Sequence, residues 1–267
     1  MKDYNKADQQ LHLLCQIIGK ANRTYIAEKA DESHTNLYFD SWGNKILGRW
    51  IQTGSGNVIV ALDLSTFNYE VLNSSRNKIL TVSTLGKTID EIEREFETQL
   101  PKAGIDPAGF RAPMPHAIPD YSFSKTAQEA IDPQALGQWK YFRELANRSS
   151  YSFLAYAQAE SEVRIWPEHF DTGVYFEYHG KIGIGFGLAM EDKMAGAPYF
   201  YMAGYPKNGS LVFENLPGSS GWKWELGEHW NGAILPLTLL ENKSDTQIDK
   251  LLSEYVIQTF EWYISQA

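Results

Sequence analysis

The sequence predicts an α+β fold in which helices alternate with groups of antiparallel strands. Apolar residues recur at spacings of three and four near the start, the middle and the end of the chain, as in amphipathic helices. Between these stretches lie short apolar runs separated by glycine-containing turns, which are typical of antiparallel hairpins. The order helix, strands, helix occurs twice, so two similar halves are expected, and a duplication could explain them.

Composition and charge narrow the class of protein. Of the 267 residues, 43% are hydrophobic and 21% are charged, which predicts a globular chain. The net charge of -9, without a basic cluster, argues against nucleic acid and anionic membranes as partners. Cys15 is the only cysteine, so neither an intramolecular disulfide nor a thiolate metal cluster is expected. The polar first ten residues and the lack of a long apolar run predict a cytoplasmic location.

The N-terminal half, residues 1–103, is expected to contain two helices around two hairpins. Leu11, Leu14 and Ile18 recur at helical spacing in the first helix. Thr88, followed three residues later by Glu91, forms a capping box that begins the second helix. The expected ranges are 9–28 for the first helix, 46–53 with 57–64 and 67–72 with 78–83 for the hairpins, and 88–100 for the second helix.

Residues 104–122 contain four prolines and no sustained periodicity, so we expect an extended connection and a boundary there. The C-terminal half is then residues 123–267. Asp132 and Pro133 suit the N-cap and the first turn of a long helix, and Ser244 begins the last helix with a second capping box. The expected ranges are 132–158 for the long helix, 172–178, 181–189 and 199–204 for strands, and, from weaker patterns, 211–214 and 222–226.

Several segments resemble a bacterial protein family of unknown function. The first helix carries a His-x-x-x-Gln-x-x-Gly-Lys pattern over 12–20, and residues 166–171 read Trp-Pro-Glu-His-Phe-Asp. The glycine-rich segment that follows, the stretch 198–206 and the pair at 262–263 are similar in the same order. The resemblance covers most of the chain and implies one conserved unit that spans both halves. It implies no activity, so no catalytic role is carried over from it.

The segment Trp166–Asp171 is the strongest local candidate for a functional site. It lies between two expected strands, and functional side chains concentrate on such loops. His169 beside Asp171 suits general base catalysis, because a carboxylate orients an imidazole and raises its basicity. The same pair could ligate a divalent metal together with His12 or Glu191. Alternatively, both side chains simply close the turn by binding backbone groups.

Two further segments carry candidate binding residues. His12, Gln16 and Lys20 lie four residues apart and form one polar stripe on the first helix, either a wall of a polar binding site or a solvated face. In the strand expected over 181–189, glycine alternates with apolar residues, so a ligand, a helix, or an aromatic ring such as Tyr175 or Tyr201 approaches the sheet closely. Glu191 and Tyr205 follow this strand, as a candidate acidic group and a candidate stacking ring.

The sequence lacks a Gly-x-Ser-x-Gly elbow, a His-Glu-x-x-His helix, a dinucleotide fingerprint and a P-loop, so the reaction class, if any, stays open. The leading hypothesis is a small-molecule pocket protein, either a binder or an enzyme, with its site around Trp166–Asp171. The alternative is an interaction or structural protein in which the same residues stabilise the fold. Neither a cofactor nor an oligomeric state is predicted. The hypothesis assigns catalysis to His169 and Asp171, and ligand binding to His12, Gln16, Lys20, Trp166, Glu191 and Tyr205.

Overall fold

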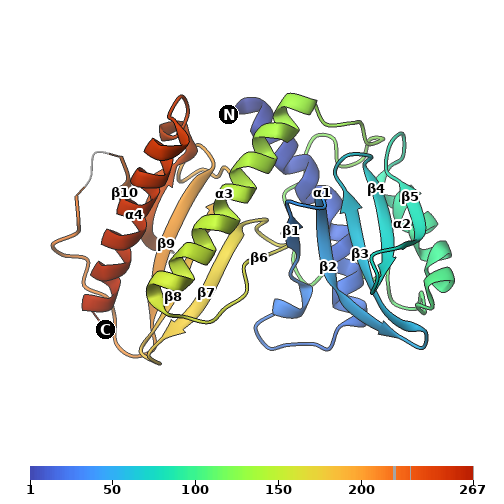
Figure 1. Cartoon of the computed structure of the whole chain (residues 1–267), viewed down its shortest axis with the longest axis horizontal. Helices are drawn as coiled ribbons and strands as arrows, with labels where there is room; N and C mark the ends of the chain where they lie inside the picture. The colour runs from blue at the N-terminus through green and yellow to red at the C-terminus, as the bar shows by residue number, and fades with distance from the viewer. Residues whose placement is uncertain (219–220, 229, 267) are drawn as a thin grey trace. The chain divides into compact units, whose positions relative to one another are not determined.

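The computed structural model describes residues 1–218, 221–228 and 230–266, and it divides into two compact units (Figure 1). The N-terminal unit comprises Lys6–Lys140 and Arg164–Phe170. The C-terminal unit comprises Met1–Asn5, Tyr141–Val163 and Asp171–Ala267. Each unit contains an antiparallel sheet and helices, so the predicted α+β class is confirmed.

The sheet of the N-terminal unit is a meander in which each strand pairs with the next, in the order β1-β2-β3-β4-β5. Helix α1 begins in the C-terminal unit and continues into this one. The elements are α1 (Lys2–Tyr25), the short 3-10 helix η1 (Ser33–Thr35), β1 (Tyr38–Asp40), β2 (Lys45–Thr53), β3 (Gly56–Asp63), β4 (Asn68–Asn73), β5 (Lys78–Ser83), α2 (Ile89–Gln99), η2 (Leu100–Ala103) and β6 (Arg164–Ile165).

Helix α1 packs tightly on this sheet. A Cβ atom at Gly48 in β2 would lie 2.6 Å from the side-chain oxygen of Asn22 and 2.8 Å from Ile18 Cγ2, so glycine permits the close approach. The Tyr69 hydroxyl donates a hydrogen bond to the carbonyl oxygen of Leu14. Cys15 is fully buried on the same helix. Helix α2 begins with the predicted capping box, in which Thr88 accepts a hydrogen bond from the Glu91 amide.

The proline-containing segment 104–122, which we expected to connect two halves, lies inside the N-terminal unit. The ring of Phe110 packs 5.5 Å from that of Phe96 on α2. The guanidinium of Arg23 donates to the carbonyl oxygens of Phe110 at 3.1 Å and Ala112 at 2.6 Å. An extended segment outside a sheet has carbonyl groups without ladder partners, and Arg23 satisfies three of them, the third being that of Gly109 at 3.4 Å. The segment is therefore part of a folded unit rather than a linker.

The strands of the C-terminal unit lie in the order β10-β11-β9-β8-β7, and every neighbouring pair is antiparallel. Helix α3 begins in the N-terminal unit and continues into this one. The elements are α3 (Pro133–Ala157), β7 (Thr172–Tyr178), β8 (Ile182–Ala189), β9 (Tyr199–Pro206), β10 (Lys223–Leu226), β11 (Asn231–Pro236), η3 (Leu237–Leu239) and α4 (Asp245–Ser265).

Helices α3 and α4 cover one face of this sheet (Figure 1). The core between them is aromatic, since the buried ring of Phe153 on α3 lies 5.4 Å from those of Phe176 and Phe186 and 5.1 Å from that of Phe260 on α4. The Ser244 capping box that begins α4 is present as predicted. The opposite face of the sheet is free of these two helices, and it carries the glycines of β8.

Most predicted elements are present with boundary shifts of a few residues, but the first helix, predicted over 9–28, begins seven residues earlier, at Lys2. Residues 211–214 form no strand, so that prediction is wrong. The sequence pattern missed β1 and β11, whereas the short strand expected just before Trp166 is present as β6, which has only two residues and joins Leu37 through a single bridge. Within the described ranges, no helix is both long and apolar enough to cross a bilayer.

Candidate functional site

The predicted polar stripe on α1 binds the Trp166–Phe170 loop rather than lining an open surface. His12 and Gln16 are both buried, and both side chains bond to the carbonyl oxygen of Pro167, from His12 Nε2 at 3.0 Å and Gln16 Nε2 at 2.7 Å. The His12 ring also stacks on Phe170, with centroids 5.2 Å apart. These contacts fix the loop onto the helix.

The partners of His12 define its protonation. A carbonyl oxygen only accepts, so Nε2 carries the proton that bonds to Pro167. In the neutral ring, Nδ1 then accepts from the Tyr121 hydroxyl, 2.7 Å away. Burial raises the pKa of Tyr121, with a further contribution from the charge of Asp8, so this phenol stays protonated and donates. Tyr121 lies in the connection 104–122, beyond the motifs that drew attention in the sequence.

A second histidine extends this chain of hydrogen bonds. His116 Nε2 lies 3.1 Å from Gln16 Oε1, whose amide nitrogen binds Pro167. Burial lowers the pKa of His116, although the carboxylate of nearby Glu168 opposes the shift. A neutral His116 therefore donates to Gln16 near pH 7. The whole chain of contacts is an ordinary device for holding a loop, and every described link in it has a structural explanation.

The remaining N-terminal candidates lie apart from that chain of contacts. Lys20 forms an ion pair with Glu93 of α2, with Nζ 2.6 Å from Oε1. The guanidinium of Arg164 lies over the Trp166 ring, 5.0 Å from its centroid. The side chain of His169 is 74% exposed, and its nearest acidic neighbour is Glu168 at 3.9 Å. The structure therefore presents His169 to solvent, whereas it buries His12.

Asp171 belongs to the C-terminal unit, so the predicted His169–Asp171 pair is divided between the two units. Its carboxylate is buried, and Oδ2 accepts a hydrogen bond of 2.5 Å from the Tyr201 hydroxyl on β9. Burial, together with the charge of Asp171, raises the pKa of Tyr201 well above its usual value, so the phenol remains a donor. One partner of Asp171 is thus a tyrosine from a strand 30 residues further along the chain.

Tyrosine rings cover the glycines of β8, which is one of the explanations predicted from the sequence. A Cβ atom at Gly183 would lie 2.1 Å from the Tyr175 hydroxyl, so glycine at this position leaves the space that the Tyr175 ring occupies. At Gly185 the nearest atoms would be ring carbons of Tyr205 and Tyr201, at 3.6 and 3.7 Å, which are ordinary contacts. Packing therefore explains glycine at position 183 but does not require it at position 185.

We refer to the face formed by Asp171, Tyr175, Tyr201, Tyr205 and Gly185 as the tyrosine face. Tyr175 and Tyr205 are 40% and 46% exposed, and their ring centroids lie 6.2 Å apart. Cross-strand pairing places Tyr175 opposite Gly185, and the rings of Tyr201 and Tyr205 border the same glycine. Accessible aromatic rings thus surround a small floor, with a hydrogen-bonded carboxylate beside it.

A buried arginine lies close to this site along the chain and was missed in the sequence. Arg143 on α3 is fully buried, and its Nη1 donates to Thr172 Oγ1 at 2.7 Å, one residue after Asp171. The sequence could have indicated this buried arginine, because the apolar stripe of α3 has polar residues at two of its positions, Arg143 and Ser150. This buried stripe consists of Leu136, Trp139, Arg143, Ala146, Ser150 and Phe153.

Glu191 lies exposed in a turn and contributes to none of these clusters. Its neighbour Asp192 accepts from the amides of Met194 and Ala195, at 2.9 and 2.8 Å, and from the Tyr199 hydroxyl at 2.7 Å. This arrangement closes the turn after β8. In the part of the chain that the structure describes, no group of three or more His, Cys, Asp or Glu side chains is arranged to hold a metal ion.

Comparison of the chain with protein-family models, with curated proteins and with solved structures finds no match. The resemblance drawn from the sequence motifs therefore stays a prediction, and the geometry of the sites alone supports a functional interpretation.

Proposed function

We propose that the C-terminal unit binds a small ring-shaped ligand that carries hydroxyl groups, on the tyrosine face of its sheet. The observation that carries the proposal is the floor at Gly185, where packing leaves room for a Cβ and the exposed ring of Tyr205 and the partly buried ring of Tyr201 border the glycine. Glycine inside a strand weakens it, so a glycine that packing does not require suggests that another molecule approaches the sheet there.

The chemistry of the rim supports this class of ligand. Tyr175 and Tyr205 offer ring faces for stacking, together with hydroxyl groups that both donate and accept. Tyr201 donates its proton to Asp171, so its oxygen is left as an acceptor for a ligand hydroxyl. Both stacking and directional hydrogen bonding favour a sugar or a phenol over an aliphatic molecule. The proposal concerns binding, and it assigns no reaction.

The test is a binding assay with a panel of monosaccharides and simple phenols, followed by saturation-transfer NMR. Tyr201→Phe removes the hydroxyl, and Gly185→Val fills the floor. We expect each variant to weaken binding by about tenfold or more, because one lost hydrogen bond to a charged network is worth roughly 1.5–3 kcal/mol. Tyr151→Phe, at an exposed position on α3, is the matched control and should bind as wild type does.

The proposal is contradicted if no member of the panel binds, or if Gly185→Val binds as tightly as wild type. Urea unfolding of each variant separates loss of binding from loss of folding. If Gly185→Val is stable and binds the ligand with normal affinity, the ligand does not bind at the Gly185 floor.

A second candidate function, an interaction protein, is favoured by one observation in the N-terminal unit. The Trp42 side chain is 99% exposed, in the turn between β1 and β2 that Asp40 closes by accepting from the amides of Trp42 and Gly43. An indole on a fixed turn is typical of the anchor residues of protein interfaces. If the partner is a second copy of this chain, sedimentation equilibrium should show that the wild type self-associates and that Trp42→Ser does not. A wild type that stays monomeric at high concentration would contradict self-association through Trp42.

A further inference from the structure

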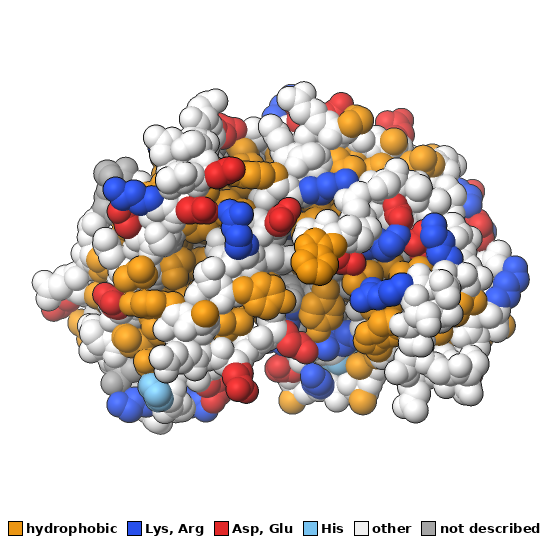
Figure 2. Space-filling model, viewed as in Figure 1, with side chains coloured by type: hydrophobic (Ala, Val, Ile, Leu, Met, Phe, Trp, Pro, Cys, Tyr) orange, Lys and Arg blue, Asp and Glu red, His pale blue; other side chains and the backbone are white. Residues whose placement is uncertain are grey.

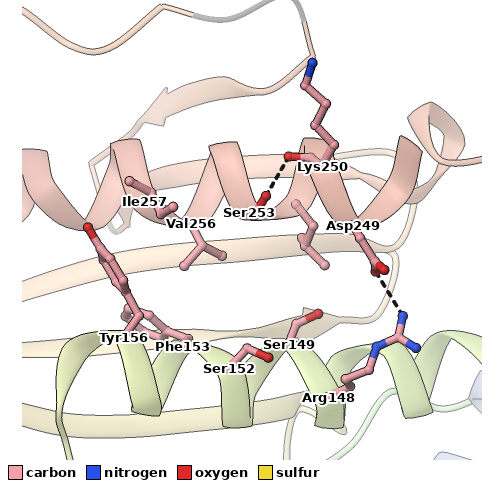
Figure 3. Close-up of a pocket in the computed structure, with 11 residues that line it drawn as sticks. Arg148, Ser149, Ser152, Phe153, Tyr156, Asp249, Lys250, Ser253, Val256 and Ile257 are labelled. Carbon is pink, nitrogen blue, oxygen red and sulfur yellow. Dashed lines mark hydrogen bonds and ion pairs between the residues drawn. The ribbon is translucent and has the colours of Figure 1, made fainter. Parts of the chain in front are cut away.

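The two helices of the C-terminal unit enclose a groove on the face opposite to the tyrosine face. The cavity has a volume of about 550 Å³ and lies between α3 and α4 (Figure 3). Volumes of this size are typical of small-molecule sites. Its floor is apolar and its walls carry three serines. Phe153, Leu252 and Val256 are buried and form the floor, and the lining also includes Ile257, Ser149, Ser152 and Ser253, which are partly or fully exposed.

Two contacts between the helices close the ends of the groove. At one end, Arg148 donates from Nη2 to Asp249 Oδ1 at 3.0 Å. At the other, Tyr156 lines the groove, and its hydroxyl donates to Glu261 Oε1 at 2.8 Å. Tyr156 lies eight positions after Arg148 on α3, so the groove is roughly 12 Å long at 1.5 Å per residue. A partner helix, about 10–12 Å wide and longer than this, would collide with both contacts.

The charges of the lining differ from those of the chain as a whole. Two cations, Arg148 and Lys250, and one anion, Asp249, line the groove, whereas the chain carries a net charge of -9. Figure 3 shows Lys250 directed away from the groove, while Arg148 lies at its end. Figure 2 shows basic, acidic and hydrophobic side chains mixed over this face, with no patch of a single sign. The available anchor for an anionic group is therefore Arg148.

We propose that this groove binds a medium-chain carboxylate, with the alkyl chain on the apolar floor and the carboxylate at Arg148. An arginine has five N–H donors, so Arg148 can bind a ligand carboxylate while it keeps its contact with Asp249. The alkyl chain gains free energy from leaving water, and the gain grows with each methylene group that is buried. This site is separate from the tyrosine face and does not depend on the function proposed for that face.

The experiment is isothermal titration calorimetry of the full chain with sodium decanoate, kept below the concentration at which it forms micelles, and with decanol. We expect one decanoate per chain. Ser152→Leu places a larger side chain in the groove and should weaken binding by about tenfold or more. Arg148→Gln should weaken decanoate by about tenfold and leave decanol unchanged. Ser152 and Arg148 are both exposed, so neither substitution is expected to unfold the protein.

Two controls make the result specific. Ala155→Leu adds the same side chain at an exposed α3 position outside the groove lining and should bind decanoate as wild type does. Tyr201→Phe, which alters the tyrosine face, should also leave decanoate affinity unchanged. Absence of decanoate binding, or binding that Ser152→Leu does not weaken, overturns the proposal. An equal loss for decanol and decanoate in Arg148→Gln overturns the assignment of the carboxylate to Arg148.

Discussion

Replacing Gly173 with alanine is expected to lower the free energy of unfolding by about 3 kcal/mol. The added Cβ would lie 2.1 Å from the carbonyl oxygen of Phe186 and 2.6 Å from Cα of Gly187, both in the backbone of the neighbouring strand β8. The backbone atoms of a paired strand cannot relieve the clash by a change of rotamer, as a side chain can. The pair β7–β8 must therefore separate locally, and cross-strand hydrogen bonds weaken with it.

Gly185→Ala is the matched control for this substitution, on the paired strand. Its Cβ would meet only ring carbons at 3.6 Å or more, so no clash is expected. Alanine also restricts the unfolded chain more than glycine does, which is worth roughly 0.5–1 kcal/mol in favour of the variant. Urea unfolding followed by tryptophan fluorescence measures both. If Gly173→Ala and Gly185→Ala lower the free energy of unfolding equally, the contact between the added Cβ at position 173 and the backbone of β8 is not the cause of the loss.

The second large effect is expected at His12. His12→Ala should cost about 2 kcal/mol, because it removes the stack on Phe170 and leaves the partly buried Tyr121 hydroxyl without its His12 acceptor. His169→Ala should change stability by no more than about 0.5 kcal/mol, because its side chain lies in solvent. The two substitutions remove the same side chain from the same unit, so the difference between them isolates the effect of burial.

Equilibrium unfolding in urea measures this difference as well. A loss for His169→Ala as large as that for His12→Ala would contradict the exposed position of His169. A neutral His12→Ala would mean that Gln16 alone holds the Pro167 carbonyl, since it donates to the same oxygen. His12→Asn, which keeps a side-chain donor, should recover part of the lost stability if the hydrogen bond to Pro167 matters.

Local sequence patterns predicted the helices and most strands because they report on local conformation. Both capping boxes, at Thr88 and Ser244, were visible as residue pairs three positions apart, and each begins a helix in the structure. The short strand β1 was missed because it contains only three residues, too few to show an alternation. In β11 a glycine near the start and a proline at the end obscured a buried apolar run.

The candidate site was less predictable because its contacts join distant segments. The sequence placed Asp171 beside His169, two positions away, whereas the structure bonds Asp171 to Tyr201 on β9. The register of three strands decides that contact, and no local pattern encodes it. His12 and Gln16 were correctly expected to share one face of the helix, but the sequence did not show that a loop 150 residues later would cover them. Arg143 was detectable only as a charged residue in an otherwise apolar stripe.

The buried cysteine on α1 is a built-in probe for the rate at which the N-terminal unit opens. Cys15 is the only thiol in the sequence, and its side chain has no exposed surface. A thiol reagent can then reach it only when α1 lifts from the sheet of the N-terminal unit or that unit opens. The rate of thiol labelling would therefore report how often the N-terminal unit opens, without an engineered probe. The C-terminal unit contains no cysteine and would not be labelled.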